Sequence, residues 1–205
     1  MTNEILFKYR SLDNWKFLLD IFLEQRLYAS SFRSLNDPME GRYYYFGDEV
    51  TKAFKRAIRE SKDYWKICSL TRKSQNTLMW SYYGGGHTGV ALGVAICQRR
   101  GQRILSVSYD NEVYVDESHL RRSPKNVALE ILSQKQLNWM HEEEVRVFSS
   151  QPFVRIELKT VLLGCQMPDA DRKLIAKLVK KVTPKAKVRQ LSRSDLDSPL
   201  NQFAT

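Results

Sequence analysis

The chain contains no apolar run that is long enough to cross a membrane as a helix. Such a span needs roughly 18 or more consecutive apolar residues, and no stretch of the 205 residues reaches that length. Residues 1–10 also lack an apolar segment followed by small residues, which is the pattern of a secretory leader. We therefore predict a cytoplasmic protein with no membrane partner.

Cysteine and histidine are scarce, with three residues of each type. Cys68, Cys97 and Cys165 have no paired spacing of the kind that binds zinc, and no two histidines are close in the sequence. We expect buried reduced thiols and no resident metal. The chain also lacks a Walker phosphate loop, a dinucleotide fingerprint and a Gly-x-Ser-x-Gly motif, so the common signatures of nucleotide and hydrolase sites are missing.

Positive charge is abundant. The chain has 33 Lys and Arg against 23 Asp and Glu, a formal net charge of +10. Eleven of these cations lie in Arg155–Arg193 together with three acidic residues up to Asp171, and we call this segment the basic lobe. A basic surface favours anionic partners such as nucleic acid, although a solvated helix face has the same composition.

The apolar pattern predicts an α+β fold. Period-two alternation and short apolar runs indicate strands at 5–9, 27–30, 65–70, 90–96, 104–109, 142–149, 153–158, 161–165 and 188–191. Helical spacing of apolar residues indicates helices at 15–23, 50–58, 76–83, 124–139 and 169–182. We predict a mixed, largely antiparallel sheet with packed helices in a single domain, 1–191, whose last part (155–191) is basic, followed by a polar tail, 192–205.

The segment Trp139–Phe148 combines charge with strand periodicity. If it is a strand, then Glu142, Glu144 and Arg146 lie two residues apart on one face, opposite apolar residues. Strands are usually poor in glutamate. The three side chains therefore form either a ladder of surface ion pairs or a polar functional site, and the pattern alone does not distinguish the two.

A second informative segment is Trp80–Gly89. It contains three aromatic residues, a triple glycine and His87, and it leads into an apolar strand. Consecutive glycines permit positive φ and a close approach of backbone to a ligand. The segment is either a ligand-binding loop or a plain connection.

Four blocks in order resemble a widespread family of bacterial and phage proteins that is classed as a domain of unknown function. One position departs from the family pattern, because many members carry a histidine where this chain has Tyr82. The blocks are Lys8-Tyr9-Arg10, Asn36-Asp37-Pro38-Met39-Glu40, Trp80-x-x-Tyr83 with His87-x-Gly89, and Lys135-x-x-x-Trp139-x-x-Glu142-x-Glu144-x-Arg146.

A looser resemblance is to ADP-ribosyltransferases of the Arg-Ser-Glu type. This chain offers Arg10, then Ser30 or Ser31, then Glu142-x-Glu144 in the same order. The resemblance implies an ADP-ribosyltransferase-like fold and NAD as the substrate, with Arg10 on its phosphates and Glu144 as the catalytic carboxylate, assisted by Glu142. The further residues that it implies around NAD are Ser30, Ser31, Tyr9, Trp80, Tyr83, His87 and Arg146.

The resemblance implies transfer of ADP-ribose to a nucleic-acid or protein acceptor, as in a toxin or a phage-defence factor, with an antitoxin as a partner. Two alternatives stay open. The protein could be a non-catalytic nucleic-acid-binding module that uses the basic lobe, in which case binding depends steeply on salt. It could also be a metal-dependent nuclease built on Glu142 and Glu144.

Overall fold

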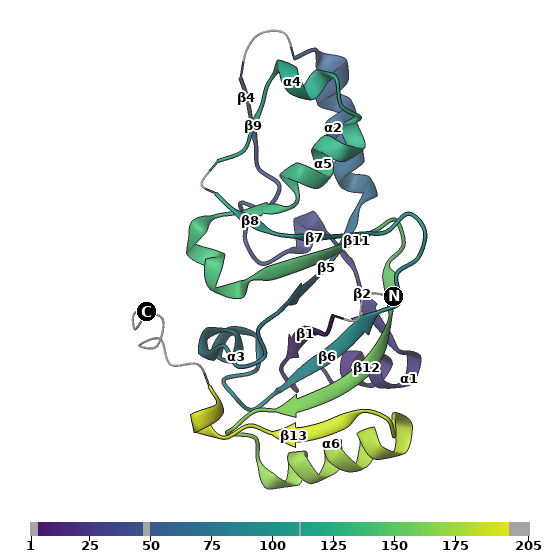
Figure 1. Cartoon of the computed structure of the whole chain (residues 1–205), viewed down its shortest axis with the longest axis vertical. Coiled ribbons are helices and arrows are strands. Elements are labelled where there is room, and N and C mark those ends of the chain that lie inside the picture. Colours follow the sequence, from purple (N-terminus) through teal and green to yellow (C-terminus); the bar gives the residue numbers. More distant parts are fainter. Residues whose placement is uncertain (1–3, 47–49, 111, 197–205) are drawn as a thin grey trace. The chain divides into compact units, whose positions relative to one another are not determined.

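The computed structural model describes residues 4–46, 50–110 and 112–196 (Figure 1). It contains a largely antiparallel sheet and several helices, so the predicted α+β class is confirmed. The chain forms two compact units that interleave along the sequence. Unit 1 comprises Met1–Leu27, Leu70–Gln98 and Val154–Thr205, and unit 2 comprises Tyr28–Ser69 and Arg99–Phe153.

The strands of unit 1 follow the order β13-β12-β6-β1, and all neighbours except β12 and β13 are antiparallel. The sequence of β6, Val-Ala-Leu-Gly-Val-Ala-Ile, is apolar throughout and almost wholly buried, as expected for a strand that is covered on both faces. The short β2 pairs with β12. The bounds are β1 (Leu6–Arg10), β2 (Arg26–Tyr28), β6 (Val90–Ile96), β12 (Phe153–Leu163) and β13 (Lys187–Gln190).

Three α-helices belong to unit 1: α1 (Trp15–Glu24), α3 (Thr77–Tyr83) and α6 (Asp169–Val182). Helix α3 packs on β1, and α6 runs beside β13 (Figure 1). Ile175 and Val179 of α6 are fully buried, whereas its lysines are exposed. This amphipathic pattern is the reason that the helix bounds could be predicted from the sequence.

Unit 2 contains the strand order β5-β11-β7 with β3 beside β5, and two small parallel pairs, β8 with β10 and β4 with β9. Its helices α2 and α5 pack on each other. The strand bounds are β3 (Ser30–Ser31), β4 (Tyr44–Tyr45), β5 (Lys66–Thr71), β7 (Arg103–Ser106), β8 (Ser108–Tyr109), β9 (Tyr114–Val115), β10 (Gln134–Lys135) and β11 (Glu144–Ser149). The helix bounds are α2 (Lys52–Tyr64), α4 (Glu117–Leu120) and α5 (Pro124–Ile131), with 3-10 turns η1 (Phe32–Ser34) and η2 (Leu137–Glu142).

The predicted helix 124–139 is too long. Helix α5 ends at Ile131, and the chain continues as β10 and then η2. Lys135 lies on β10, where it is buried and paired with Glu142. Apolar periodicity assigns a lysine to the surface. Helix α5 therefore ends before Lys135.

Two predicted strand bounds also differ. Strand β11 begins at Glu144, because Glu143 has a left-handed backbone (φ +40°) that closes η2. The two predicted strands 153–158 and 161–165 are one strand, β12, with a register shift between Leu158 and Thr160.

The first residues of the predicted polar tail, 192–196, form a further 3-10 turn, η3 (Arg193–Asp195), and residues 197–205 lie outside the described part of the chain. Among the described helices, none has the length and apolar character needed to cross a membrane.

Candidate functional site

Arg10 is the last residue of β1, and the pairing of β1 with β6 fixes its position. It lies opposite Val90 in this antiparallel pair. The preceding Gly89 has to be glycine, because a Cβ atom there would lie 2.2 Å from the carbonyl oxygen of Arg10. This close approach of two backbones fixes the point at which the chain leaves the sheet and turns toward α1.

The turn from β1 into α1 brings polar side chains beside Arg10. Ser11 Oγ donates a hydrogen bond to Asp13 Oδ2 at 2.7 Å. Asn14 is the N-cap residue of α1, yet its side chain makes no capping hydrogen bond. An N-cap asparagine normally accepts from a backbone N–H of the first turn. The Asn14 amide is therefore left for another partner.

Helix α3 is held on β1 by two buried aromatic residues. The rings of Tyr9 and Trp80 meet edge to face, with centroids 5.0 Å apart. Trp80 is fully buried, and its Nε1 donates to the carbonyl of Ser74 at 3.0 Å. The Tyr9 hydroxyl donates to the carbonyl of Lys73 at 3.0 Å. Trp80 thus supports α3 from the core, which differs from the position beside NAD that the resemblance implies for it.

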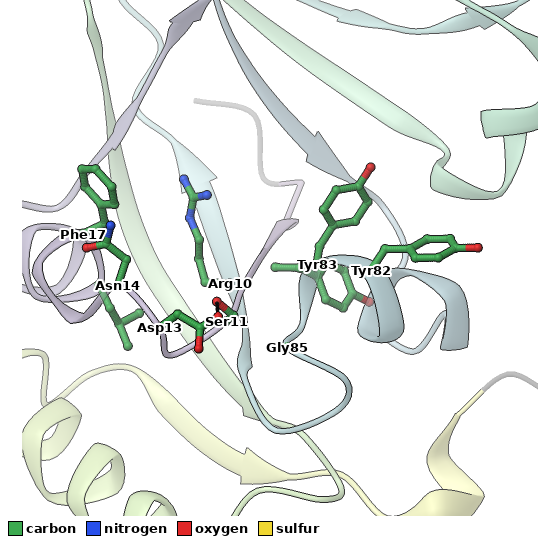
Figure 2. A pocket seen from close by; sticks show the side chains of 10 residues that line it. Arg10, Ser11, Asp13, Asn14, Phe17, Tyr82, Tyr83 and Gly85 are labelled. Carbon is green, nitrogen blue, oxygen red and sulfur yellow. Dashed lines mark hydrogen bonds between the residues drawn. The ribbon is translucent and has the colours of Figure 1, made fainter. Parts of the chain in front are cut away.

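A pocket of about 310 Å³ opens between the β1–α1 turn and α3. Figure 2 shows the Arg10 side chain rising between Asn14 and Phe17 on one side and Tyr83 on the other, directed away from Asp13. Tyr9 and Leu18 contribute to its buried lining. We call this cavity the Arg10 pocket, and its more exposed lining comprises Arg10, Ser11, Asp13, Asn14, Phe17, Tyr82, Tyr83 and Gly85.

The chemistry of the lining is mixed. Arg10 supplies a cation with a planar fork of donors that suits a phosphate. Phe17 and Tyr82 are 57% and 63% exposed, so both present large aromatic surfaces to solvent at the pocket. Aromatic faces of this kind stack on nucleobases. Gly85 has φ +59°, a conformation that favours glycine and leaves the rim of the pocket without a side chain.

His87 lies next to this pocket but bonds within the loop. Its Nε2 is 3.1 Å from Ser81 Oγ, which also donates to the carbonyl of Thr77 at 3.0 Å. A hydroxyl that donates to a carbonyl can only accept from the imidazole, so this pair is not arranged as a nucleophile and its base. The contact joins the end of α3 to the glycine loop, whose backbone at His87 has φ +68°.

The second gathering of predicted residues lies in unit 2, around Arg146. The Arg146 side chain is fully buried and bridges two carboxylates. Its guanidinium bonds Glu40 at 2.6 and 2.9 Å and Glu144 at 2.8 and 2.9 Å. It also donates to the carbonyl of Leu132 at 2.5 Å. Strand β11 is buried on both faces, so the alternative of a ladder of surface ion pairs is wrong.

Lys135 completes this cluster. Its Nζ donates to Glu142 at 2.6 Å, lies 3.5 Å from Glu144, and sits over the Trp139 ring at 4.6 Å from the centroid. Glu142 belongs to η2 and not to the strand. The carboxylates of Glu142 and Glu144 are therefore brought together by a shared lysine, and not by neighbouring positions on one face of a strand. We call Glu40, Lys135, Glu142, Glu144 and Arg146 the buried ionic cluster.

Burial and ion pairing act against each other on these carboxylates. Burial disfavours the charge on Glu144, but the adjacent Arg146 guanidinium and Lys135 outweigh it and lower the pKa of Glu144 to about 2. For Glu40 burial dominates and raises its pKa, although Arg146 bonds it. Burial also raises the pKa of Tyr109, whose hydroxyl accepts from the backbone N–H of Glu144 at 2.7 Å. Glu144 is therefore ionised at neutral pH.

The remaining predicted residues, Ser30 and Ser31, lie on β3 of unit 2, where they pair with β5. Ser31 Oγ accepts from the backbone N–H of Arg33 and caps η1. The structure thus divides the predicted residues into two sets. Unit 1 holds Arg10, Tyr9, Trp80, Tyr83 and His87, whereas unit 2 holds Ser30, Ser31, Glu142, Glu144 and Arg146.

The four motif blocks sort in the same way. The first and third blocks meet at the Arg10 pocket, and the second and fourth meet at the buried ionic cluster, where Glu40 binds Arg146. The sequence analysis placed Glu40 in a motif block without naming its partner, and it gave no ligand-binding role to Asp13, Asn14 or Phe17. The only available signal was composition, since Asp and Asn before a helix usually indicate a cap.

Within the described residues, no group of three His, Cys, Asp or Glu side chains is arranged to hold a metal ion. The acidic side chains of the buried ionic cluster are paired with Lys135 and Arg146. The nuclease alternative therefore gains no support from this site.

Comparison of the chain with protein-family models, with curated proteins and with solved structures found no match. The two family resemblances remain predictions from motif order.

Proposed function

We propose that this protein is an ADP-ribosyltransferase-like enzyme that binds NAD in the Arg10 pocket. The observation that carries the proposal is the set of groups around this cavity. One pocket is lined by a guanidinium, a carboxylate, exposed aromatic rings and the amide of Asn14, which makes no capping hydrogen bond. The guanidinium complements a phosphate, the carboxylate and the amide complement ribose hydroxyls, and the aromatic rings complement a base.

The volume supports a partial fit. At about 310 Å³ the pocket is at the lower end of the range for small-molecule sites, roughly 300–1,000 Å³. One nucleotide half of NAD therefore suits the pocket better than the whole dinucleotide. The other half would extend beyond the residues that line it.

As a prediction from motif order alone, the carboxylate of the transfer is Glu144 of unit 2. Transfer breaks the bond between the ribose and nicotinamide and forms a bond from the same sugar carbon to an oxygen or nitrogen of the acceptor, which gives up its proton. Positive charge develops on the sugar as nicotinamide leaves. An ionised carboxylate stabilises that charge, and the low pKa of Glu144 is the property that this role requires. Both oxygens of Glu144 already bond Arg146 or Lys135. The same carboxylate therefore has a structural role as well.

Binding and transfer are tested separately. Titration calorimetry should show that NAD binds to the wild type. Arg10→Gln should lose roughly tenfold or more in affinity for NAD, because a charge-assisted phosphate contact is removed. The exposed control Arg155→Gln should bind NAD with the wild-type affinity. No binding of NAD to the wild type would refute the proposal.

Transfer is measured with NAD labelled in its ADP-ribose part, mixed with nucleic-acid or protein acceptors, and by release of nicotinamide. Glu144→Gln should abolish label transfer, whereas the neighbouring exposed Glu143→Gln should retain it, with circular dichroism confirming that both variants fold. Binding of NAD without any transfer or nicotinamide release would leave a nucleotide-binding protein and overturn the enzymatic part.

A second candidate function is nucleic-acid binding by the basic lobe. Its supporting observation is the outer side of α6, where Lys173, Lys177, Lys180 and Lys181 are all exposed. Lysines three or four residues apart on a helix repel one another, and phosphates would relieve that repulsion. The apolar side of α6 is buried in the protein, so the helix does not have a free apolar face to insert into a lipid surface.

This candidate is tested by fluorescence anisotropy with labelled DNA and RNA over a salt series. Reversing charge at Lys177, Lys180 and Lys181 should abolish binding and its salt dependence. Reversal at three exposed cations of α2, Lys52, Arg56 and Arg59, is the matched control, and Glu144→Ala should bind as the wild type does. Equal loss in both triple variants would show a general charge effect and contradict the assignment to α6.

A further inference from the structure

We infer that the Arg10 pocket takes the adenosine half of the dinucleotide and that Asp13 makes it select a ribose with free hydroxyls, so that NAD is accepted and NADP, which is phosphorylated on this ribose, is rejected. This inference rests on the proposed function, since it presupposes that the pocket binds a nucleotide. It adds the chemical feature of the ligand that the pocket distinguishes.

Two opposite charges lie at the Arg10 pocket. Arg10 and Asp13 both line the pocket, and Figure 2 shows the Arg10 side chain extending away from Asp13. The cavity therefore has a cationic end and an anionic end. A ligand that satisfies both ends carries an anionic group at one end and hydrogen-bond donors at the other.

The Asp13 carboxylate is held by one of its oxygens. Ser11 Oγ donates to Oδ2 at 2.7 Å and so holds the side chain in place. Among the described residues, no hydrogen bond to Oδ1 is found. An ionised carboxylate can only accept hydrogen bonds. The free oxygen therefore fits a ribose hydroxyl, which can donate.

A second polar group in this pocket is Asn14. Its side chain lines the pocket and is not used to cap α1. An amide can both donate and accept, so it can bond the second hydroxyl of a ribose whichever way that hydroxyl points. Asp13 and Asn14 are adjacent in the chain and together match a pair of neighbouring hydroxyls.

An added phosphate on the ribose would weaken binding. A phosphate on a ribose hydroxyl replaces a donor with a group that only accepts and that carries close to two negative charges. It would meet the Asp13 carboxylate without an additional cation among the other lining residues, which are uncharged apart from Arg10. Repulsion between such charges a few ångströms apart near a surface corresponds to roughly tenfold or more in affinity.

The test compares NAD with NADP by titration calorimetry. The wild type should bind NAD roughly tenfold or more tightly than NADP. Asp13→Asn should bring the two affinities to within about threefold, mainly by strengthening NADP binding, because the amide can donate to the phosphate. Glu24→Gln, which removes an exposed carboxylate at the other end of α1, is the control and should keep the wild-type ratio.

The outcomes separate the two proposals. Binding of NAD and NADP with equal affinity to the wild type, or an unchanged ratio in Asp13→Asn, would overturn the selectivity while NAD binding stands. Failure of the wild type to bind either dinucleotide would overturn both. As a second readout, 2′-deoxy-AMP should bind more weakly than AMP to the wild type and equally well to Asp13→Ala. An equal preference for AMP in both proteins would contradict a contact between Asp13 and the ribose.

Discussion

Removal of the charge of Arg146 should destabilise the fold far more than removal of a surface arginine. In Arg146→Met, Glu40 and Glu144 lose four hydrogen bonds of 2.6 to 2.9 Å and keep the cation Lys135 at 3.8 and 3.5 Å. Leaving a buried charge without its partner costs about 3–5 kcal/mol. Since small domains are stable by about 5–15 kcal/mol, this loss is a large share of the total.

Urea unfolding followed by circular dichroism measures the effect. With a slope of about 2 kcal/mol per molar urea, the midpoint should fall by about 2 M. Arg56→Met is the matched control, because its ion pair with Glu60 is 2.8 Å long but mostly exposed, so its loss should leave the midpoint almost unchanged. The double variant Arg146→Met/Glu40→Leu should lose less than the two single losses combined. A cost below about 1 kcal/mol for Arg146→Met would refute the interpretation of the cluster as buried and mutually dependent.

Three further predictions concern other groups. The pKa of Glu144 is lowered from 4.5 to about 2, so as the pH falls this carboxylate is protonated in the unfolded chain before it is protonated in the folded chain. The urea midpoint should therefore fall as the pH drops from about 4.5 toward 2, and it should fall by less in Glu144→Gln. Burial lowers the pKa of Lys62 from 10.5 to about 8, so the folded chain releases its proton first; stability relative to Lys62→Met should rise between pH 8 and 10.5, and a constant difference would contradict this. Gly89→Ala should displace the end of β1, because its Cβ would lie 2.2 Å from the Arg10 carbonyl oxygen, and it should weaken NAD binding. The control Gly101→Ala, at a positive-φ position with open space around it, should change stability only.

The sequence was sufficient for those elements in which one side is buried and the other is not. Helix α6 was predicted with its bounds because Ile175 and Val179 alternate with lysines at helical spacing, and β6 because its run of apolar residues is too short for most helices. Predictions failed around Lys135 and Glu142. Both are charged and buried, which is a combination that hydrophobic patterning assigns to the surface.

The candidate site was predicted less well than the fold, for a related reason. Arg10 could be singled out because it lies in the first motif block and takes the place of the arginine in the Arg-Ser-Glu order. Asp13, Asn14 and Phe17 could not, since the residues before a helix are polar in most proteins and an exposed aromatic carries no periodic signal. The partnership of Glu40 with Arg146 joins residues 106 positions apart, and no local pattern contains that information.

The interleaving of the two units has a consequence for biosynthesis. All segments of unit 2 lie before Val154, so its core can close while about the last quarter of the chain is still to be translated. Unit 1 takes β12, α6 and β13 from that last quarter. Until β12 emerges from the ribosome, the apolar strand β6 has no partner strand along one of its edges. Nascent chains should therefore acquire protease resistance in unit 2 first, and β6 should be the segment that chaperones protect longest during synthesis.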